Sequence, residues 1–266
     1  MDMPNIGMGT FRLKDEVAYQ SVLTALELGY RHIDTAQIYG NETQVGQALA
    51  DSGIAREQVF LTTKIWRDNL DKNNFMNSLR TSLDQLQTEY VDLLLIHWPV
   101  DSTALSLEQS LTELKYAQEL GVAKRIGVSN FTIAQLERAI RLLGAQSIFT
   151  NQIEVHPYLQ NIKLRHFMQT QGIRTTAYMP LAVGKVLQEP ELVTMAQKYQ
   201  ITVPQLVLAW VIQQGMDTIP MSTKRQNLLS NLQTPALNLT AADLAVFTSL
   251  EQGLRLANPS FAPLWD

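Results

Sequence analysis

One alternation runs through the whole chain: short runs rich in β-branched and apolar residues are each followed by a longer stretch with helical periodicity. The eight strand-like runs lie at residues 6–9, 31–34, 59–64, 91–97, 125–129, 148–153, 174–178 and 218–221. Helix-like segments include residues 15–28, 75–86 and 107–120, with an extra helix at 191–199 and a carboxyl-terminal one at 241–250. Strands that alternate with helices indicate a parallel sheet, and eight such units in 266 residues predict an α/β fold, the closed (β/α)8 TIM barrel.

The connections support one continuous domain. Several helix-like segments end at a glycine that suits a left-handed helix cap, namely Gly29, Gly53, Gly121, Gly144, Gly172 and Gly215. No Pro/Ser-rich linker or low-complexity tract divides the chain. We therefore predict a single barrel domain over residues 1–266.

Composition excludes several classes of function. The formal net charge is -4 and no basic block stands out, so nucleic acid and anionic membranes are poor candidate partners. The chain has no cysteine, which removes disulfides and thiolate chemistry, and His32, His156 and His166 lack metal-ligand spacing, so we expect no metal. No signal peptide is visible at the amino terminus and no apolar run could span a bilayer, so we expect a cytoplasmic protein.

A short glycine pattern near the start imitates another fold. Gly7-Met-Gly9-Thr-Phe-Arg12 precedes a helix and Asp34 ends the next strand, as in a dinucleotide-binding Rossmann unit. Arg12 stands where the third glycine would be needed for close packing of helix on strand. This alternative also leaves the polar residues at later strand ends unexplained.

Those strand ends carry the functional signal. Asp34, Lys64 and His97 end three consecutive predicted strands, and Tyr39 follows Asp34 in the next loop. Each residue alone is more simply a turn, surface or packing residue. In a (β/α)8 barrel, however, the carboxyl-terminal strand ends build the active site, so these four side chains are predicted to meet at one rim.

The chemistry that fits this set is carbonyl reduction by hydride transfer. Negative charge that develops on the carbonyl oxygen needs a proton donor and a hydrogen bond, which Tyr39 and His97 can supply. We expect the ammonium of Lys64 to lower the pKa of Tyr39, and Asp34 to keep Lys64 protonated and in place. None of these side chains can store a hydride, so a nicotinamide cofactor is required.

The motifs resemble those of the aldo-keto reductase family over nearly the whole chain. The similar stretches are Gly7–Phe11, Asp34–Glu42, Thr63–Trp66, Leu95–Pro99, Ile126–Phe131, Asn151–Glu154 and Ala177–Leu181. This resemblance implies NADPH as cofactor and a catalytic tetrad of Asp34, Tyr39, Lys64 and His97, with Tyr39 as proton donor. It also implies that Ser129, Asn130 and Gln152 bind the nicotinamide carboxamide and that Tyr178 stacks on the ring.

Further residues are expected to bind the cofactor. By the same resemblance Gly9, Thr10 and Phe11 lie beside the mouth, and Asp34 and Leu181 are also candidates. At the adenosine end the hydroxyls, charges and helix start after Pro220 predict Ser222, Thr223, Lys224, Arg225 and Asn231. Met221 and Asn227 stand where the family often has basic residues. We expect Lys224 and Arg225 to replace those cations at the ribose phosphate; the alternative is that both point into solvent at the helix start.

The substrate side is predicted from aromatic residues next to the tetrad. Phe11, Tyr39, Trp66, His97 and Trp98 are expected to line it, whereas Trp265 could equally be a packing residue. Short loops at residues 99–106 and 254–266 suggest a shallow, open pocket for small aldehydes, methylglyoxal or keto-sugar acids such as 2,5-diketo-D-gluconate.

Two other classes of function stay open, and the resemblance also suggests a monomer. One alternative is a non-catalytic NADPH-binding subunit, against which the complete tetrad argues. The other is a lyase or isomerase that forms a Schiff base on Lys64.

Overall fold

The computed structural model describes all residues, 1–266. Eight strands form one sheet in which each strand pairs in parallel with the next along the chain. They are β1 (Met8–Gly9), β2 (His32–Asp34), β3 (Phe60–Ile65), β4 (Val91–Ile96), β5 (Ala123–Ser129), β6 (Ile148–Glu154), β7 (Arg174–Tyr178) and β8 (Asp217–Thr218). A parallel bridge between Ile6 and Thr218 joins the two ends of the sheet. The predicted closed barrel is therefore confirmed.

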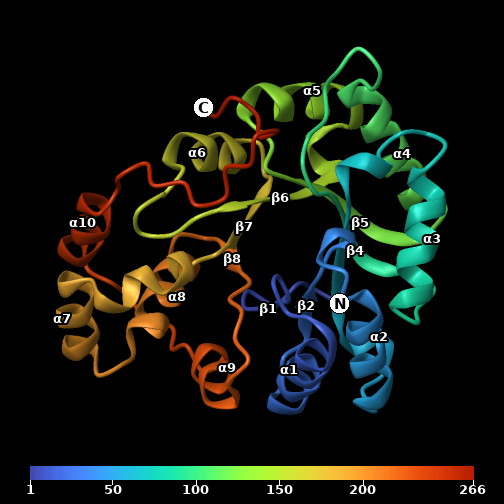
Figure 1. Cartoon of the computed structure of the whole chain (residues 1–266). Coiled ribbons are helices and arrows are strands. Elements are labelled where there is room, and N and C mark those ends of the chain that lie inside the picture. Colours follow the sequence, from blue (N-terminus) through green and yellow to red (C-terminus); the bar gives the residue numbers. More distant parts are fainter.

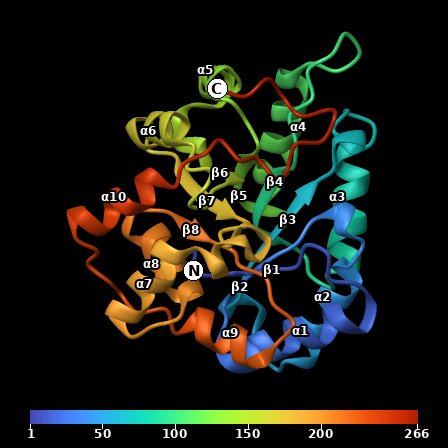
Figure 2. The same cartoon turned by 60° about the vertical axis from the view of Figure 1, so that its left-hand side comes forward.

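The helices lie around the strands, as Figures 1 and 2 show. They are α1 (Asp15–Leu28), α2 (Glu42–Asp51), α3 (Phe75–Gln85), α4 (Leu107–Glu119), α5 (Ile133–Leu143), α6 (Ile162–Thr170), α7 (Pro190–Tyr199), α8 (Val203–Gln213), α9 (Arg225–Leu232) and α10 (Ala241–Ser249). Helix α7 is the predicted extra helix between β7 and α8, and α10 is the predicted carboxyl-terminal one. The predicted helices therefore form within one residue of their expected bounds at each end.

Local sequence signals explain where the helices begin and end. Helix α5 begins at a capping box, in which the Thr132 side chain accepts from the backbone N–H of Gln135 and the Gln135 side chain accepts from that of Thr132. Helix α1 ends at Gly29, whose φ of 106° is left-handed and whose N–H donates to the carbonyl of Leu26 (3.1 Å). A residue with a side chain would be strained there, which is why the glycine marks the helix end.

The seam of the barrel is shorter than predicted. Strand β1 covers only Met8–Gly9 of the expected residues 6–9, and β8 covers Asp217–Thr218 where 218–221 was expected. Pro220 explains part of this difference, since it has no N–H to donate to a neighbouring strand. Gly9 lies very close to the other side of the seam: a Cβ on it would be 2.7 Å from the carbonyl oxygen of Ile219. Glycine at this position thus permits the close approach that closes the barrel.

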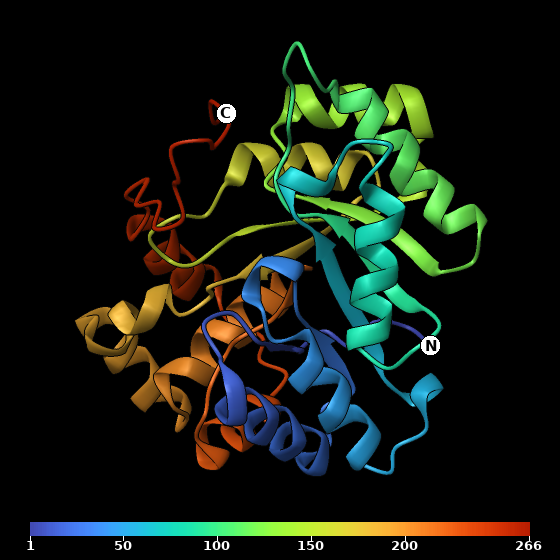
Figure 3. The same cartoon turned by 45° about the vertical axis from the view of Figure 1, so that its right-hand side comes forward.

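The two ends of the barrel differ in what covers them. Met3 packs with Phe60 and Leu93 near the amino ends of the strands, whereas the tail after α10 crosses the opposite end (Figures 1 and 3). A cluster of 54 buried hydrophobic residues joins strands and helices, so the chain has one principal core and forms a single domain. None of the helices is both long and apolar enough to cross a membrane.

Candidate active site

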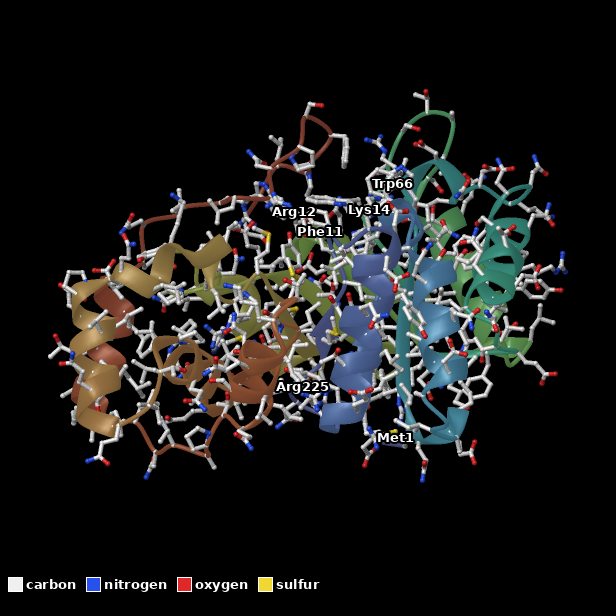
Figure 4. The ribbon with its side chains drawn as sticks, turned by 60° about the horizontal axis from the view of Figure 1, so that its bottom comes forward. Met1, Phe11, Arg12, Lys14, Trp66 and Arg225 are labelled. Atoms are coloured by element: carbon white, nitrogen blue, oxygen red, sulfur yellow. The ribbon has the colours of Figure 1, made fainter.

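A cavity of about 790 Å³ opens at the carboxyl-terminal ends of the strands, as a (β/α)8 barrel predicts. It gathers most of the predicted site residues: Gly9, Phe11, Asp34, Tyr39, Trp66, His97, Trp98, Ser129, Asn130, Gln152, Tyr178 and Leu181. In Figure 4 Phe11, Arg12 and Trp66 lie in the upper central part of the view, and Arg225 lies below them. Segments distant in the sequence therefore share one cavity.

Asp34 lines the floor of this cavity, and its ion-pair partner Lys64 is buried behind it. Lys64 Nζ donates to Asp34 Oδ1 (2.5 Å), to the carbonyl of Thr35 (2.9 Å) and to the hydroxyl oxygen of Tyr39 (3.4 Å). Asp34 and Lys64 are buried, and Asp34 Oδ2 also accepts from Gln152 Nε2 (2.7 Å). Strands β2, β3 and β6 thus hold the ammonium in one place, beside the Tyr39 hydroxyl.

The ionisation of Tyr39 differs from the sequence-based expectation. We expected Lys64 to lower the pKa of Tyr39, but burial and then the negative charge of Asp34 raise this pKa well above its usual value. The expectation was wrong because Asp34 pairs with Lys64 and offsets its charge at the phenol. Tyr39 is therefore protonated at neutral pH, the state that a proton donor needs.

His97 follows β4 and is a neutral imidazole. Burial and then the charge of Lys64 lower its pKa well below the usual value. Its Nδ1 is buried with no hydrogen-bond partner. Burial of an N–H group without an acceptor costs more free energy than burial of an unprotonated nitrogen without a donor. We therefore assign the proton to Nε2. The ring lies edge-on to those of Tyr39 (5.5 Å between centroids) and Trp66 (5.4 Å).

A row of polar side chains extends from this floor toward β7. Tyr178 donates its hydroxyl to Asn130 Oδ1 (2.7 Å), and Asn130 Nδ2 donates to Ser129 Oγ (3.1 Å) and to the carbonyl of His97 (3.0 Å). Ser129 Oγ in turn donates to the carbonyl of Gln152 (2.8 Å). Asn130 has a left-handed φ of 62°, a conformation that asparagine tolerates better than most residues. The row is therefore held rigidly at the cavity wall.

The loop that carries Phe11 is tied down by a residue that sequence reasoning did not identify. Asn41 Nδ2 donates to the carbonyls of Thr10 (2.9 Å) and Leu13 (3.0 Å), and its Oδ1 accepts from Thr35 Oγ1 (2.7 Å). Thr10, a predicted cofactor residue, is buried and bonds to the carbonyl of Asp34 (3.1 Å) and does not line the cavity. Asn41 thus fixes the Phe11 loop against the end of β2.

The predicted adenosine end is only partly brought to the cavity. Met221 and Asn227 line its wall, but Ser222, Thr223, Lys224, Arg225 and Asn231 do not. Arg225 forms an exposed ion pair with Glu27 of α1 (2.8 Å), and Lys224 is exposed at the start of α9. Asn231 is buried in the same helix. Both predicted cations thus stand next to this wall rather than in it.

The carboxyl-terminal tail supplies lining residues that sequence reasoning missed: Leu256, Ala257, Asn258, Pro259 and Phe261. The Phe261 ring packs edge-on against those of Trp66 (5.7 Å between centroids) and Trp98 (5.6 Å). Trp265 stays outside the cavity and stacks under the Arg255 guanidinium (3.7 Å). No residue of the loop at 99–106 lines the cavity, whereas the short tail does. An aromatic wall therefore faces Tyr39 and His97.

Comparison with known proteins identifies the family. The model of the aldo/keto reductase family matches residues 5–252. The chain is 49% identical to proteins named methylglyoxal reductase DkgB from Salmonella typhi and Escherichia coli O157:H7, with all of each chain covered.

Solved structures agree with this assignment. One provisionally described as a 2,5-diketo-D-gluconic acid reductase B shares 38% identity and a TM-score of 0.94, covering 99% of this chain and 94% of that one. A Bombyx mori aldo-keto reductase in complex with NADP shares 32% identity and a TM-score of 0.89, covering 96% and 92%. The chain therefore belongs to the aldo/keto reductase family and is an oxidoreductase.

Proposed function

We propose that this enzyme reduces methylglyoxal and related small carbonyl compounds, including keto-sugar acids, and that Tyr39 supplies the proton. The observation that supports this most is the position of the Tyr39 hydroxyl, 3.4 Å from Lys64 Nζ, in a cavity that His97 also lines. Relatives that carry the name methylglyoxal reductase at 49% identity favour the same substrate class. The aromatic wall of Trp66, Trp98 and Phe261 suits the apolar part of a small carbonyl compound.

NADPH is the hydride donor. The cavity fits such a cofactor: besides the polar row, it presents Val183, Leu187 and Met221, which are large, apolar and exposed. Exposed apolar side chains in one groove are suited to a ligand with flat apolar faces. Ser129, Asn130 and Gln152 are our candidates for holding the carboxamide, with Tyr178 against the ring. At the other end, Lys224 and Arg225 are our candidates for the ribose phosphate.

The protein's own groups manage the proton and the developing charge. As the substrate oxygen becomes negative, the Tyr39 hydroxyl donates its proton, and His97 Nε2–H donates a hydrogen bond to the same oxygen. The raised pKa of Tyr39 does not prevent this transfer, because an alkoxide is a stronger base than a phenolate. Lys64 Nζ, beside the phenolic oxygen, stabilises the phenolate that results.

The surroundings of Lys64 disfavour the Schiff-base alternative. A Schiff base needs a neutral amine that a carbonyl carbon can reach. The three donor positions of the ammonium are directed to Asp34, Thr35 and Tyr39, and Lys64 is buried and does not line the cavity. We therefore expect borohydride to trap no substrate adduct on Lys64.

The deciding test is Tyr39→Phe, which keeps the ring and removes the proton donor. With methylglyoxal and NADPH, kcat is expected to fall by about 10²–10⁴-fold, as when a general acid is lost. The Kd for NADPH should stay within about twofold, because no charged hydrogen bond to the cofactor is removed. A variant with wild-type kcat in a chemistry-limited assay would refute the assignment.

Two expectations about the protein's surroundings stay predictions. One is a cytoplasmic location, and the other is a monomeric state. Sedimentation of the purified enzyme would test the second, and a mass of about 30.0 kDa is expected for a single chain.

A further inference from the structure

We propose that Glu154 is a positioning residue that anchors the carboxyl-terminal tail as the wall of the substrate pocket. The proposal concerns the arrangement of the pocket and not the hydride or proton transfer. It rests on the proposed function only in treating the cavity beside Tyr39 as the site where carbonyl substrates bind.

Glu154 ends β6 and is wholly buried. Its carboxylate accepts three hydrogen bonds of 2.8 Å: from His156 Nε2 and Leu256 N at Oε1, and from Ala257 N at Oε2. Burial alone would raise the pKa of Glu154, but these hydrogen bonds outweigh it and the pKa lies below its usual value. A buried carboxylate is thus committed to two consecutive backbone N–H groups of the tail.

The main chain of Glu154 holds the tail from a second direction. Its carbonyl accepts from Asn161 Nδ2 (2.7 Å), and Asn161 Oδ1 accepts from the Arg255 guanidinium (3.0 Å). Arg255, Leu256 and Ala257 are therefore all tied, directly or through Asn161, to one residue at the end of a barrel strand. That strand end is rigid because Glu154 is in register with Tyr178 of β7.

The anchored residues lead directly into the pocket wall. Leu256 and Ala257 line the cavity themselves, and Phe261 follows, packed on Trp66 and Trp98. Further along, Asp266 accepts from the N–H of Ile133 at the start of α5 (3.0 Å). Between these two attachments the hydrogen bonds of the tail are internal, from Ala262 N to the Pro259 carbonyl (2.9 Å) and from Trp265 Nε1 to Asn258 Oδ1 (2.9 Å). Side-chain packing on Trp66 and Trp98 is what joins this segment to the barrel, so loss of the Glu154 contacts should let Phe261 move away from a bound substrate.

The main test is Glu154→Gln, because an amide nitrogen cannot accept from a tail N–H and would face it as a second donor. For 4-nitrobenzaldehyde, whose aromatic ring suits the aromatic wall to which Phe261 belongs, KM is expected to rise about tenfold, corresponding to one charged hydrogen bond. Its kcat should change less than about twofold, since Tyr39, Lys64 and His97 are untouched. Phe261→Ala should shift KM in the same direction.

A second readout needs no turnover. Trypsin cleaves after arginine, and the Arg255–Leu256 bond contains the N–H that Glu154 holds. Cleavage at this bond can be followed by mass spectrometry. If the detached tail is about tenfold more populated in Glu154→Gln than in wild type, cleavage should be about tenfold faster. Asp217→Asn is the matched control, because it neutralises another buried barrel carboxylate, paired with Arg174, that does not contact the tail.

The outcomes separate the possible failures. Wild-type KM and wild-type cleavage in Glu154→Gln, or equal changes in Asp217→Asn, would overturn the proposal. If Glu154→Gln does not fold, Ala257→Pro decides, since it removes a tail N–H and leaves the buried carboxylate intact. If the wild-type enzyme reduces neither 4-nitrobenzaldehyde nor methylglyoxal, the proposed function fails, and the cleavage rates still decide on the anchor.

Discussion

The ion pair between Asp34 and Lys64 should contribute far more to stability than a surface pair of the same chemistry. The two side chains are 1% and 0% exposed and 2.5 Å apart. Removal of one partner leaves a buried, uncompensated charge, which costs about 3–5 kcal/mol. Asp34→Asn and Lys64→Met are therefore each expected to lower the free energy of unfolding by about that amount.

The double variant Asp34→Asn/Lys64→Met distinguishes this account from simple loss of packing. With both charges gone, no unpaired ion remains, so the double variant should be more stable than the sum of the single changes predicts, by about 3 kcal/mol. The matched control is the Glu27–Arg225 pair, which has a 2.8 Å contact but 54% and 60% exposed side chains. Its coupling should be about 0–1 kcal/mol.

Urea unfolding, followed by tryptophan fluorescence, provides the measurement. Additivity of the Asp34 and Lys64 changes within about 0.5 kcal/mol would refute the reasoning, since uncoupled sites behave in this way. Turnover should be impaired in all three variants, because each removes a group beside Tyr39. Recovery of stability without recovery of activity in the double variant would separate the structural part of the pair from its part in catalysis.

Two further predictions concern acid stability and cofactor choice. Burial lowers the pKa of His32 to about 4, so the unfolded chain binds more protons between that pH and about 6.5, and stability falls as the pH falls through this window. His32→Gln should remove up to about 3 kcal/mol of this acid-dependent loss in the free energy of unfolding, measured by urea unfolding at several pH values. An unchanged slope of the free energy of unfolding against pH would count against this prediction. Lys224→Ala/Arg225→Ala should reduce the ratio of NADPH to NADH affinity by about ten- to hundredfold. An unaltered ratio of NADPH to NADH affinity would contradict this prediction. Glu27→Gln is the control, since it releases Arg225 from its ion pair and should not reduce that ratio.

The barrel could be predicted from the sequence because its causes are local. Alternation of strand-like and helix-like periods indicates a parallel sheet, and glycines such as Gly29 and Gly121 mark the ends of helices within a few positions. The polar residues Asp34, Lys64 and His97 could be placed together for the same reason. Once the strands are parallel, their carboxyl ends must lie at one rim, and no knowledge of side-chain packing is needed.

The position of the carboxyl-terminal tail could not be predicted, because it depends on long-range contacts that no local sequence pattern indicates. Leu256 bonds to Glu154 across 102 residues, and the tail after Ser249 has no regular helix or strand whose period could reveal a buried face. Phe261 therefore looked like any isolated aromatic residue. Glu154 itself carried a partial signal, as a carboxylate that closely follows a predicted strand, but its partners are backbone N–H groups without a sequence signature.

The protonation of Tyr39 shows why the sign of one neighbouring charge does not by itself determine the direction of a pKa shift. The sequence correctly placed an ammonium next to the phenol, and an isolated ammonium would favour the phenolate. In the folded protein, however, Asp34 is bonded to that ammonium at 2.5 Å, and its negative charge disfavours the phenolate. Burial then becomes the largest effect and raises the pKa. The same pair that keeps Lys64 in place thus keeps Tyr39 protonated until a substrate oxygen becomes basic enough to take the proton.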